Sequence, residues 1–162
     1  MVKLSAEGFR GHVPRDYIPL PALTETRQLC GINSKTDPKG FEIMKLPGPD
    51  HPIAITANPK RIRVLADGVV IADTQKALTL KEASYPAVQY LPREDAHMEL
   101  LQRTDRVTHC PYKGDASYFS INANGKTLDN AIWTYETPFP AMAEISGYLA
   151  FYPDKVQIEE VA

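Results

Sequence analysis

From residue 53 onward, short apolar runs alternate with turn residues, a pattern that is typical of β-strands. Residues 61–64 alternate between arginine and an apolar residue, so one face of this segment is apolar and the other is charged. Asp67 and Gly68 then separate two apolar runs, which predicts a hairpin because both residues tolerate a positive φ. Residues 69–73 are the expected return strand.

Further strands are expected along the rest of the chain, with a second tight turn at Asn124 and Gly125. They are predicted at residues 77–83, 87–91, 107–110, 117–121, 131–135, 148–152 and 155–159, the last two forming a hairpin. Short strands separated by turns favour an antiparallel barrel or folded sheet. Strands and helices do not alternate, which argues against a parallel sheet. The pattern therefore predicts a mainly β fold.

One or two short helices are expected to interrupt the strands. Residues 93–102 follow a proline and carry Glu94 and Asp95 in the first turn, where the helix dipole favours acidic side chains. A shorter helical turn is predicted over residues 139–145, which end before Ser146 and Gly147.

Residues 1–52 differ from the rest of the chain because they are rich in proline and have few periodic apolar runs. Seven of the 14 prolines lie here, at positions 14, 19, 21, 38, 47, 49 and 52. A short helix is expected over residues 23–30. Because apolar residues are also frequent, we interpret this segment as an arm that packs on the main body. The predicted domains are thus an arm, 1–52, and a β domain, 53–162.

Length, charge and cysteine content limit the class of protein. The 162 residues suit one domain, and the net charge of −2 is unusual for a non-specific nucleic-acid binder. No apolar run has the length of a membrane span or of a signal-peptide core. The chain has two cysteines, Cys30 and Cys110, whereas a secreted disulfide scaffold usually carries more. We expect a cytoplasmic protein without nucleic-acid or membrane partners; a disulfide between the two cysteines stays open.

The densest group of reactive side chains lies in residues 108–118, Thr-His-Cys-Pro-Tyr-Lys-Gly-Asp-Ala-Ser-Tyr. Cys110 could act as a nucleophile if a cation such as Lys113 lowered the pKa of its thiol. A buried, unreactive thiol is the favoured interpretation, since free cysteine is often buried. His109 is not expected to serve as its base, because neighbouring residues of a strand point to opposite faces.

Other residues around this stretch suggest a binding pocket. Lys113 could hold an anion or remain a solvated turn lysine. Tyr118 and Trp133 lie on neighbouring predicted strands and could wall a pocket, or simply pack in the core. Glu82 ends an apolar strand, and it could pair with an arginine of residues 61–63 or reach the cavity.

Several common motifs are missing from the sequence. It contains no CxxC pair for a structural zinc site, no GxGxxG and no P-loop. It also lacks the Asp-x-Asp and Asp-x-Glu pairs that often hold two magnesium ions for phosphoryl transfer. We therefore expect no metal and no cofactor.

The run 108–118 resembles the signature of the bacterial domain of unknown function 427. Blocks in the same order support the resemblance over about residues 51–159, namely 68–73, Glu82, 85–92, 131–135 and 145–152. It implies a β-tent-like fold, two antiparallel sheets leaning together over a pocket, similar to methionine-R-sulfoxide reductases and the ligand-binding domain of cereblon. The family sometimes bears a nucleotidyltransferase label. The zinc-holding cysteine pairs of many β-tent proteins are missing here.

Carried over residue by residue, the resemblance points to one set of candidate site residues: Glu82, Tyr90, Cys110, Lys113, Tyr118 and Trp133. Our first hypothesis is a domain that binds a small molecule or peptide in a pocket between the two sheets, with aromatic walls and Lys113 at the polar end of the ligand. The alternative is an enzyme that uses Cys110 or Lys113, for thiol chemistry or nucleotidyl transfer. A third hypothesis is a scaffold in which the arm, residues 1–52, bridges a homodimer.

Overall fold

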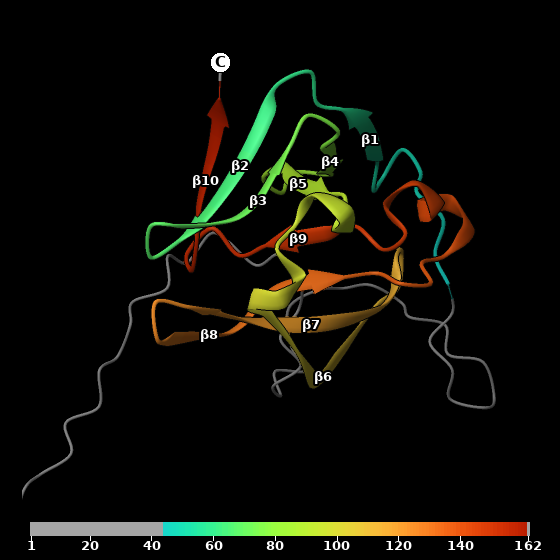
Figure 1. Cartoon of the computed structure of the whole chain (residues 1–162). Coiled ribbons are helices and arrows are strands. Elements are labelled where there is room, and N and C mark those ends of the chain that lie inside the picture. The colour runs from blue at the N-terminus through green and yellow to red at the C-terminus, as the bar shows by residue number, and fades with distance from the viewer. Residues whose placement is uncertain (1–43, 162) are drawn as a thin grey trace, which may run out of the picture.

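Ten strands form two antiparallel sheets within residues 44–161, the residues that this computed structural model describes (Figure 1). The prediction of a mainly β, two-sheet fold is confirmed. The predicted helix over residues 23–30, the thiol of Cys30 and most of the predicted arm lie outside the described residues. No helix within residues 44–161 has both the length and the apolar character needed to cross a membrane.

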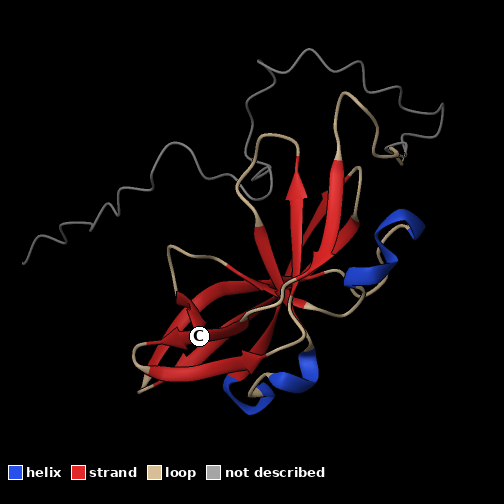
Figure 2. Ribbon diagram, turned by 90° about the horizontal axis from the view of Figure 1, so that it is seen from above, coloured by secondary structure: helices blue, strands red, loops and turns tan. Residues whose placement is uncertain are grey.

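The larger sheet has seven strands and the smaller has three. The order in the larger sheet is β1 (Ile53–Ala57), β4 (Leu78–Glu82), β5 (Val88–Leu91), β9 (Leu149–Phe151), β8 (Lys126–Thr134), β7 (Gly114–Ala123) and β6 (Leu101–Cys110). The order in the smaller sheet is β10 (Gln157–Val161), β2 (Arg61–Ala66) and β3 (Val69–Thr74). Seen from above, the strands form two groups that diverge from a common centre, with the helical turns at the outside (Figure 2).

Both predicted tight turns are present. Asp67 and Gly68 join β2 to β3 with φ values of 49° and 80°, and Asn124 and Gly125 join β7 to β8 with φ values of 49° and 71°. Positive φ at both central positions matches the right-handed twist of the flanking strands. The local sequence was therefore sufficient to place these two hairpins.

The predicted helix over residues 93–102 is wrong. The segment contains two short 3-10 turns, η1 (Arg93–Asp95) and η2 (Met98–Leu100), and then enters β6 directly at Leu101. The predicted turn near residue 139 is confirmed as a 3-10 segment, η3 (Pro140–Ile145).

Backbone pairing with a strand of the smaller sheet explains why residues 93–102 do not form one helix. Ala96 has an extended backbone, with φ −113° and ψ 147°, and forms a bridge with Ala72 of β3. The amide of His97 also donates to the carbonyl of Ile71, at 2.8 Å. These tertiary hydrogen bonds replace helical ones, so the intrinsic helix preference of the segment is overridden.

The predicted hairpin between residues 148–152 and 155–159 is also wrong, because its two strands belong to different sheets. β9 lies between β5 and β8, whereas β10 pairs with β2. The chain turns tightly after Tyr152, whose carbonyl accepts from the amides of Lys155 and Val156 at 2.9 and 3.2 Å. Val156 is then buried in the core between the sheets, which directs the chain from one sheet to the other.

The larger sheet buries a separate apolar core on each face. The core between the two sheets combines Ile62, Val64 and Ile71 of the smaller sheet with Leu91, Phe119, Ile121, Ile132, Leu149 and Phe151 of the larger one. The core on the opposite face contains Leu80, Tyr90, Cys110, Ala116, Tyr118, Trp133, Tyr135, Met142, Ile145 and Ala150. Successive residues such as Tyr118 and Phe119 alternate between the cores, as the pleat of a strand requires.

The larger sheet curls, and the second core lies inside the curl. Glu82 ends β4, near one edge of the sheet, and Lys113 lies in the turn between β6 and β7, at the other edge. In a flat sheet these strands would be about 20 Å apart, yet the two side chains form an ion pair. The two ends of the sheet therefore approach each other.

Candidate functional site

Four of the predicted site residues meet in the core inside the curl. Tyr90 on β5, Cys110 at the end of β6, Tyr118 on β7 and Trp133 on β8 all point to this face and are almost fully buried. Tyr90, Tyr118 and Trp133 alternate along their strands with Leu91, Phe119 and Ile132, which face the core between the two sheets. Side chains that are far apart in the sequence thus share one enclosed cluster.

Aromatic contacts order this cluster. Tyr118 and Trp133 lie directly opposite each other in the β7–β8 register. The indole N–H of Trp133 donates to the hydroxyl of Tyr90 at 3.3 Å, and the two rings meet edge to face. The ring of Tyr152 lies 4.6 Å from that of Trp133, and the hydroxyl of Tyr118 is 2.8 Å from that of Thr108. These contacts hold the rings in fixed orientations.

Glu82 and Lys113 form a buried ion pair at the open end of the curl. The side chain of Lys113 is 4% exposed and that of Glu82 is 15% exposed. The imidazole Nε2 of His51 lies 2.9 Å from the other carboxylate oxygen of Glu82. Burial by itself would raise the pKa of the Glu82 carboxyl, but Lys113 and then His51 hold that pKa below its usual value. Glu82 is therefore ionised at neutral pH, and the charge of Lys113 is balanced.

The interpretation of Glu82 as a partner of the arginines at 61–63 is wrong. Arg61 and Arg63 instead bind Asp73 across the β2–β3 pair, at 2.6 and 3.0 Å. The interpretation of Lys113 as a solvated turn lysine is wrong as well, because Lys113 is buried. The pairing of Glu82 with Lys113 was not visible in the sequence, because it depends on how strands that are distant in the sheet are brought together.

Tyr135 is a further member of the cluster that the sequence reasoning did not single out. Its side chain is fully buried, and its hydroxyl has no hydrogen-bond partner among the described residues. Burial raises the pKa of Tyr135 well above its usual value, and Tyr90, Cys110, Tyr118 and Glu82 raise it further. The hydroxyl therefore stays neutral and can donate a hydrogen bond. Alternation along the predicted strand 131–135 was the available signal, because residues 133 and 135 of a strand share a face.

Comparison with protein-family models matches residues 54–162 to the model described as a domain of unknown function, DUF427. The chain belongs to the DUF427 family. The resemblance first seen in residues 108–118 is thereby confirmed. A search of curated proteins finds no match to the chain. The matched region includes all six candidate residues, whereas His51 precedes it.

The segment just before the DUF427 match covers one side of the cluster. His51 stacks on Tyr112 with ring centroids 4.1 Å apart and planes 7° apart. The amide of Lys45 donates to the carbonyl of Pro111 at 2.8 Å. Burial, followed by Glu82 and Cys110, raises the pKa of the Tyr112 phenol. His51 was missed as a candidate, because its contact with Tyr112 joins the predicted arm to the Cys-Pro-Tyr-Lys turn.

Among the residues that the structure describes, the one thiol of this DUF427 chain is that of Cys110, which is free but enclosed. Cys110 is 6% exposed and forms no disulfide within the described residues. His109 faces away from it and lies with Nδ1 2.6 Å from a carboxylate oxygen of Asp115. Thiol chemistry at Cys110 stays a prediction. Within residues 44–161, no three His, Cys, Asp or Glu side chains come together in a group that could hold a metal ion.

The location of the candidate residues corrects one part of the sequence prediction. The space between the two sheets is filled by its own apolar core, to which the DUF427 candidate residues do not contribute. They lie instead inside the curl of the larger sheet. Alternation along the strands could place them on a common face, but the sequence did not show that one sheet would curl around that face.

Proposed function

We propose that this DUF427 chain binds a small molecule inside the curl of the larger sheet, where Tyr135 donates a hydrogen bond to a neutral polar group of the ligand. The fully buried hydroxyl of Tyr135, which has no hydrogen-bond partner among residues 44–161, carries the proposal. An unsatisfied buried hydroxyl costs roughly 1–3 kcal/mol, and a ligand that supplies an acceptor would recover that free energy.

The surrounding side chains favour a flat, mainly apolar ligand body. Tyr90, Tyr118 and Trp133 offer ring faces and edges of the kind that contact planar ligands in other pockets. Access is expected beside Glu82 and His51, whose side chains are 15% and 26% exposed.

The ion pair argues against a free acid as ligand. The sequence suggested that Lys113 fixes an acidic or polar end of the ligand, but Glu82 balances the charge of Lys113. A carboxylate entering the cluster would therefore face an existing carboxylate and would lose its hydration. A neutral carbonyl, amide or hydroxyl group avoids both costs and still satisfies Tyr135.

A thermal-shift screen tests this proposal with pairs of flat compounds, each pair differing only in a neutral amide or a carboxylate. Neutral members are expected to raise the melting temperature of the native protein, because a ligand that binds only the folded state stabilises it. The same compounds should raise the melting temperature of Tyr135→Phe much less. Tyr85→Phe is the matched control, since Tyr85 is exposed and should respond like the native protein.

Two results would contradict the proposal. One is a screen in which no neutral compound stabilises the protein, because the cluster is then filled by its own side chains. The other is a compound that stabilises Tyr135→Phe as strongly as the native protein, because the hydroxyl of Tyr135 then takes no part in binding.

A further inference from the structure

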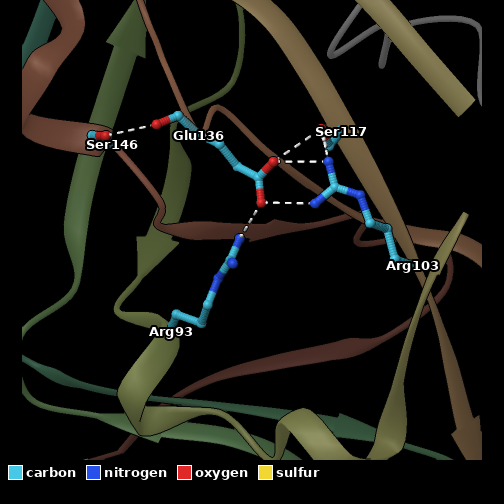
Figure 3. Close-up of polar contacts among 5 residues, drawn as sticks. All are labelled: Arg93, Arg103, Ser117, Glu136 and Ser146. Atoms are coloured by element: carbon cyan, nitrogen blue, oxygen red, sulfur yellow. Dashed lines mark hydrogen bonds and ion pairs between the residues drawn. The ribbon is translucent and has the colours of Figure 1, made fainter.

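A second polar cluster, on the other face of the larger sheet, centres on Glu136. The two guanidinium nitrogens Nη1 and Nη2 of Arg103 each donate to one carboxylate oxygen of Glu136, both at 2.8 Å. Nη2 of Arg93 donates to the same carboxylate at 3.2 Å. Figure 3 shows the carboxylate of Glu136 held between the two arginines, with Ser117 beside Arg103.

The donors come from elements that the fold holds firmly in place. Arg93 belongs to η1, Arg103 to β6 and Ser117 to β7, whereas Glu136 lies in the loop after β8. Both guanidinium groups lie over the ring of Phe119, 5.5 and 5.9 Å from its centroid. The ring of Phe119 thus helps to orient both guanidinium groups, in addition to their ion pairs with Glu136.

The cluster has more positive charge and more donors than one carboxylate uses. Two arginines and one glutamate leave a net charge of +1 on these side chains. The Nε of Arg93 is buried and has no hydrogen-bond partner within the described part of the chain. The hydroxyl of Ser117 accepts from Nη2 of Arg103 at 2.9 Å, but it donates to the carboxylate of Glu136 at the long distance of 3.4 Å. A larger anion with more acceptor oxygens would satisfy this set better.

We propose that Arg93, Arg103 and Ser117 form a binding site for a phosphate monoester, and that Glu136 occupies this site when no phosphate is bound. A phosphate dianion neutralises both arginines, and its three terminal oxygens can accept from the Arg103 fork, from Arg93 and from Ser117. Arg93, Arg103 and Glu136 are 35%, 55% and 33% exposed, so a ligand can reach the site from solvent. Displacing Glu136 requires only that its side chain swing out of the site.

Titration with inorganic phosphate, followed by the amide and arginine side-chain NMR signals of the full chain, tests this site. Glu136→Gln removes the competing charge but keeps the size of the side chain, so phosphate should bind about tenfold more tightly than to the native protein. The signals of Ser117 and of the two arginine side chains should move. Acetate, a monoanion with two oxygens, should bind more weakly than phosphate to the same variant.

The Asp73 cluster offers a matched control. Asp73 is also bound by two arginines, Arg61 and Arg63, so Asp73→Asn changes the total charge by the same amount. It should leave phosphate binding at Arg93, Arg103 and Ser117, followed by the NMR signals of these residues, unchanged. A second variant, Arg103→Gln in the Glu136→Gln background, should abolish the gain in phosphate affinity. Circular dichroism would show that this double variant stays folded.

The proposal fails if Glu136→Gln binds phosphate no more tightly than the native protein. It also fails if Asp73→Asn strengthens phosphate binding at Arg93, Arg103 and Ser117 as much as Glu136→Gln does, because the effect at this site would then reflect net charge alone. Neither result depends on ligand binding at Tyr135, which lies in the other core of the sheet.

Discussion

The hydroxyl groups of Tyr118 and Tyr135 are equally buried but differ in their surroundings. The hydroxyl of Tyr118 lies 2.8 Å from that of Thr108. That of Tyr135 has no hydrogen-bond partner in the described region. Removing a hydrogen-bonded group and removing an unsatisfied one have opposite effects on stability, so these two phenols can be compared directly.

The variants Tyr118→Phe and Tyr135→Phe should differ in stability, because only the first loses a hydrogen bond. Tyr118→Phe is expected to lower the free energy of unfolding by about 1 kcal/mol, because the hydroxyl of Thr108 loses its partner. Tyr135→Phe is expected to leave that free energy unchanged or raise it slightly, because no bond is lost. Urea denaturation of both variants provides the measurement. An equal loss for Tyr135→Phe would show that its hydroxyl is satisfied in solution, which removes the basis for the proposed ligand contact.

At the scale of elements, the turn between β6 and β7 determines where Lys113 points. The amide of Lys113 donates to the carbonyl of Cys110 at 3.2 Å, and Gly114 begins β7 with a φ of 99°. The carbonyl of Lys113 accepts from the amide of Phe139 at 3.0 Å, so the turn is also tied to the loop before η3. This backbone geometry directs the side chain of Lys113 towards Glu82.

The variants Gly114→Ala and Gly125→Ala measure how much free energy of unfolding is lost when each turn has to hold a residue other than glycine. A φ of 99° lies beyond the left-handed region that other residues reach, whereas Gly125 has a φ of 71°, at the edge of that region. A Cβ at Gly114 would make ordinary van der Waals contacts, 3.6 Å from backbone atoms of Thr137 and Phe139, and one at Gly125 would have no atom within 4 Å, so the expected difference comes from φ. Gly114→Ala should cost about 2 kcal/mol and Gly125→Ala about 1 kcal/mol.

Chemical denaturation of the two alanine variants gives both values. Equal costs would mean that the β6–β7 turn relaxes freely, and the orientation of Lys113 would then have to be set by its ion pair instead.

At the scale of the whole molecule, the ion pair of Glu82 and Lys113 joins the two ends of the curled sheet. β4 and the β6–β7 turn lie near opposite edges of that sheet, so the ion pair is a contact across the open end of the curl. Removing one partner of a buried ion pair leaves the other charge without compensation. The global stability of the fold should therefore depend on the ionisation of Glu82.

We expect Glu82→Gln to lower the free energy of unfolding by about 3 kcal/mol at neutral pH. The folded-state pKa of Glu82 lies below its usual value of 4.5, so its contribution is complete above that pH and is lost as the pH falls through the folded-state pKa. The difference between native protein and variant should therefore shrink in acid. Urea denaturation across a pH series measures it.

Glu160→Gln is the control for this experiment, because Glu160 pairs with Lys60 at an exposed position. It should change stability by less than about 0.5 kcal/mol at any pH. A Glu82→Gln penalty that stays constant into strong acid would show that the loss comes from packing and not from charge.

The sequence by itself determined the features that depend on neighbours along the chain. Alternation placed Tyr118 and Trp133 on one face of adjacent strands, and the turns at Asp67 and Asn124 placed two hairpins, because side-chain direction and turn geometry are local properties. The same reasoning failed for residues 93–102, where pairing with β3 replaced a helix.

Only the tertiary structure decided which distant groups meet. The curl of the larger sheet brings Glu82 to Lys113 and His51 to Tyr112, and it leaves the hydroxyl of Tyr135 enclosed without a partner in the described region. Such contacts depend on strand order and sheet curvature, which arise from the packing of the whole chain. No local pattern of residues specifies them.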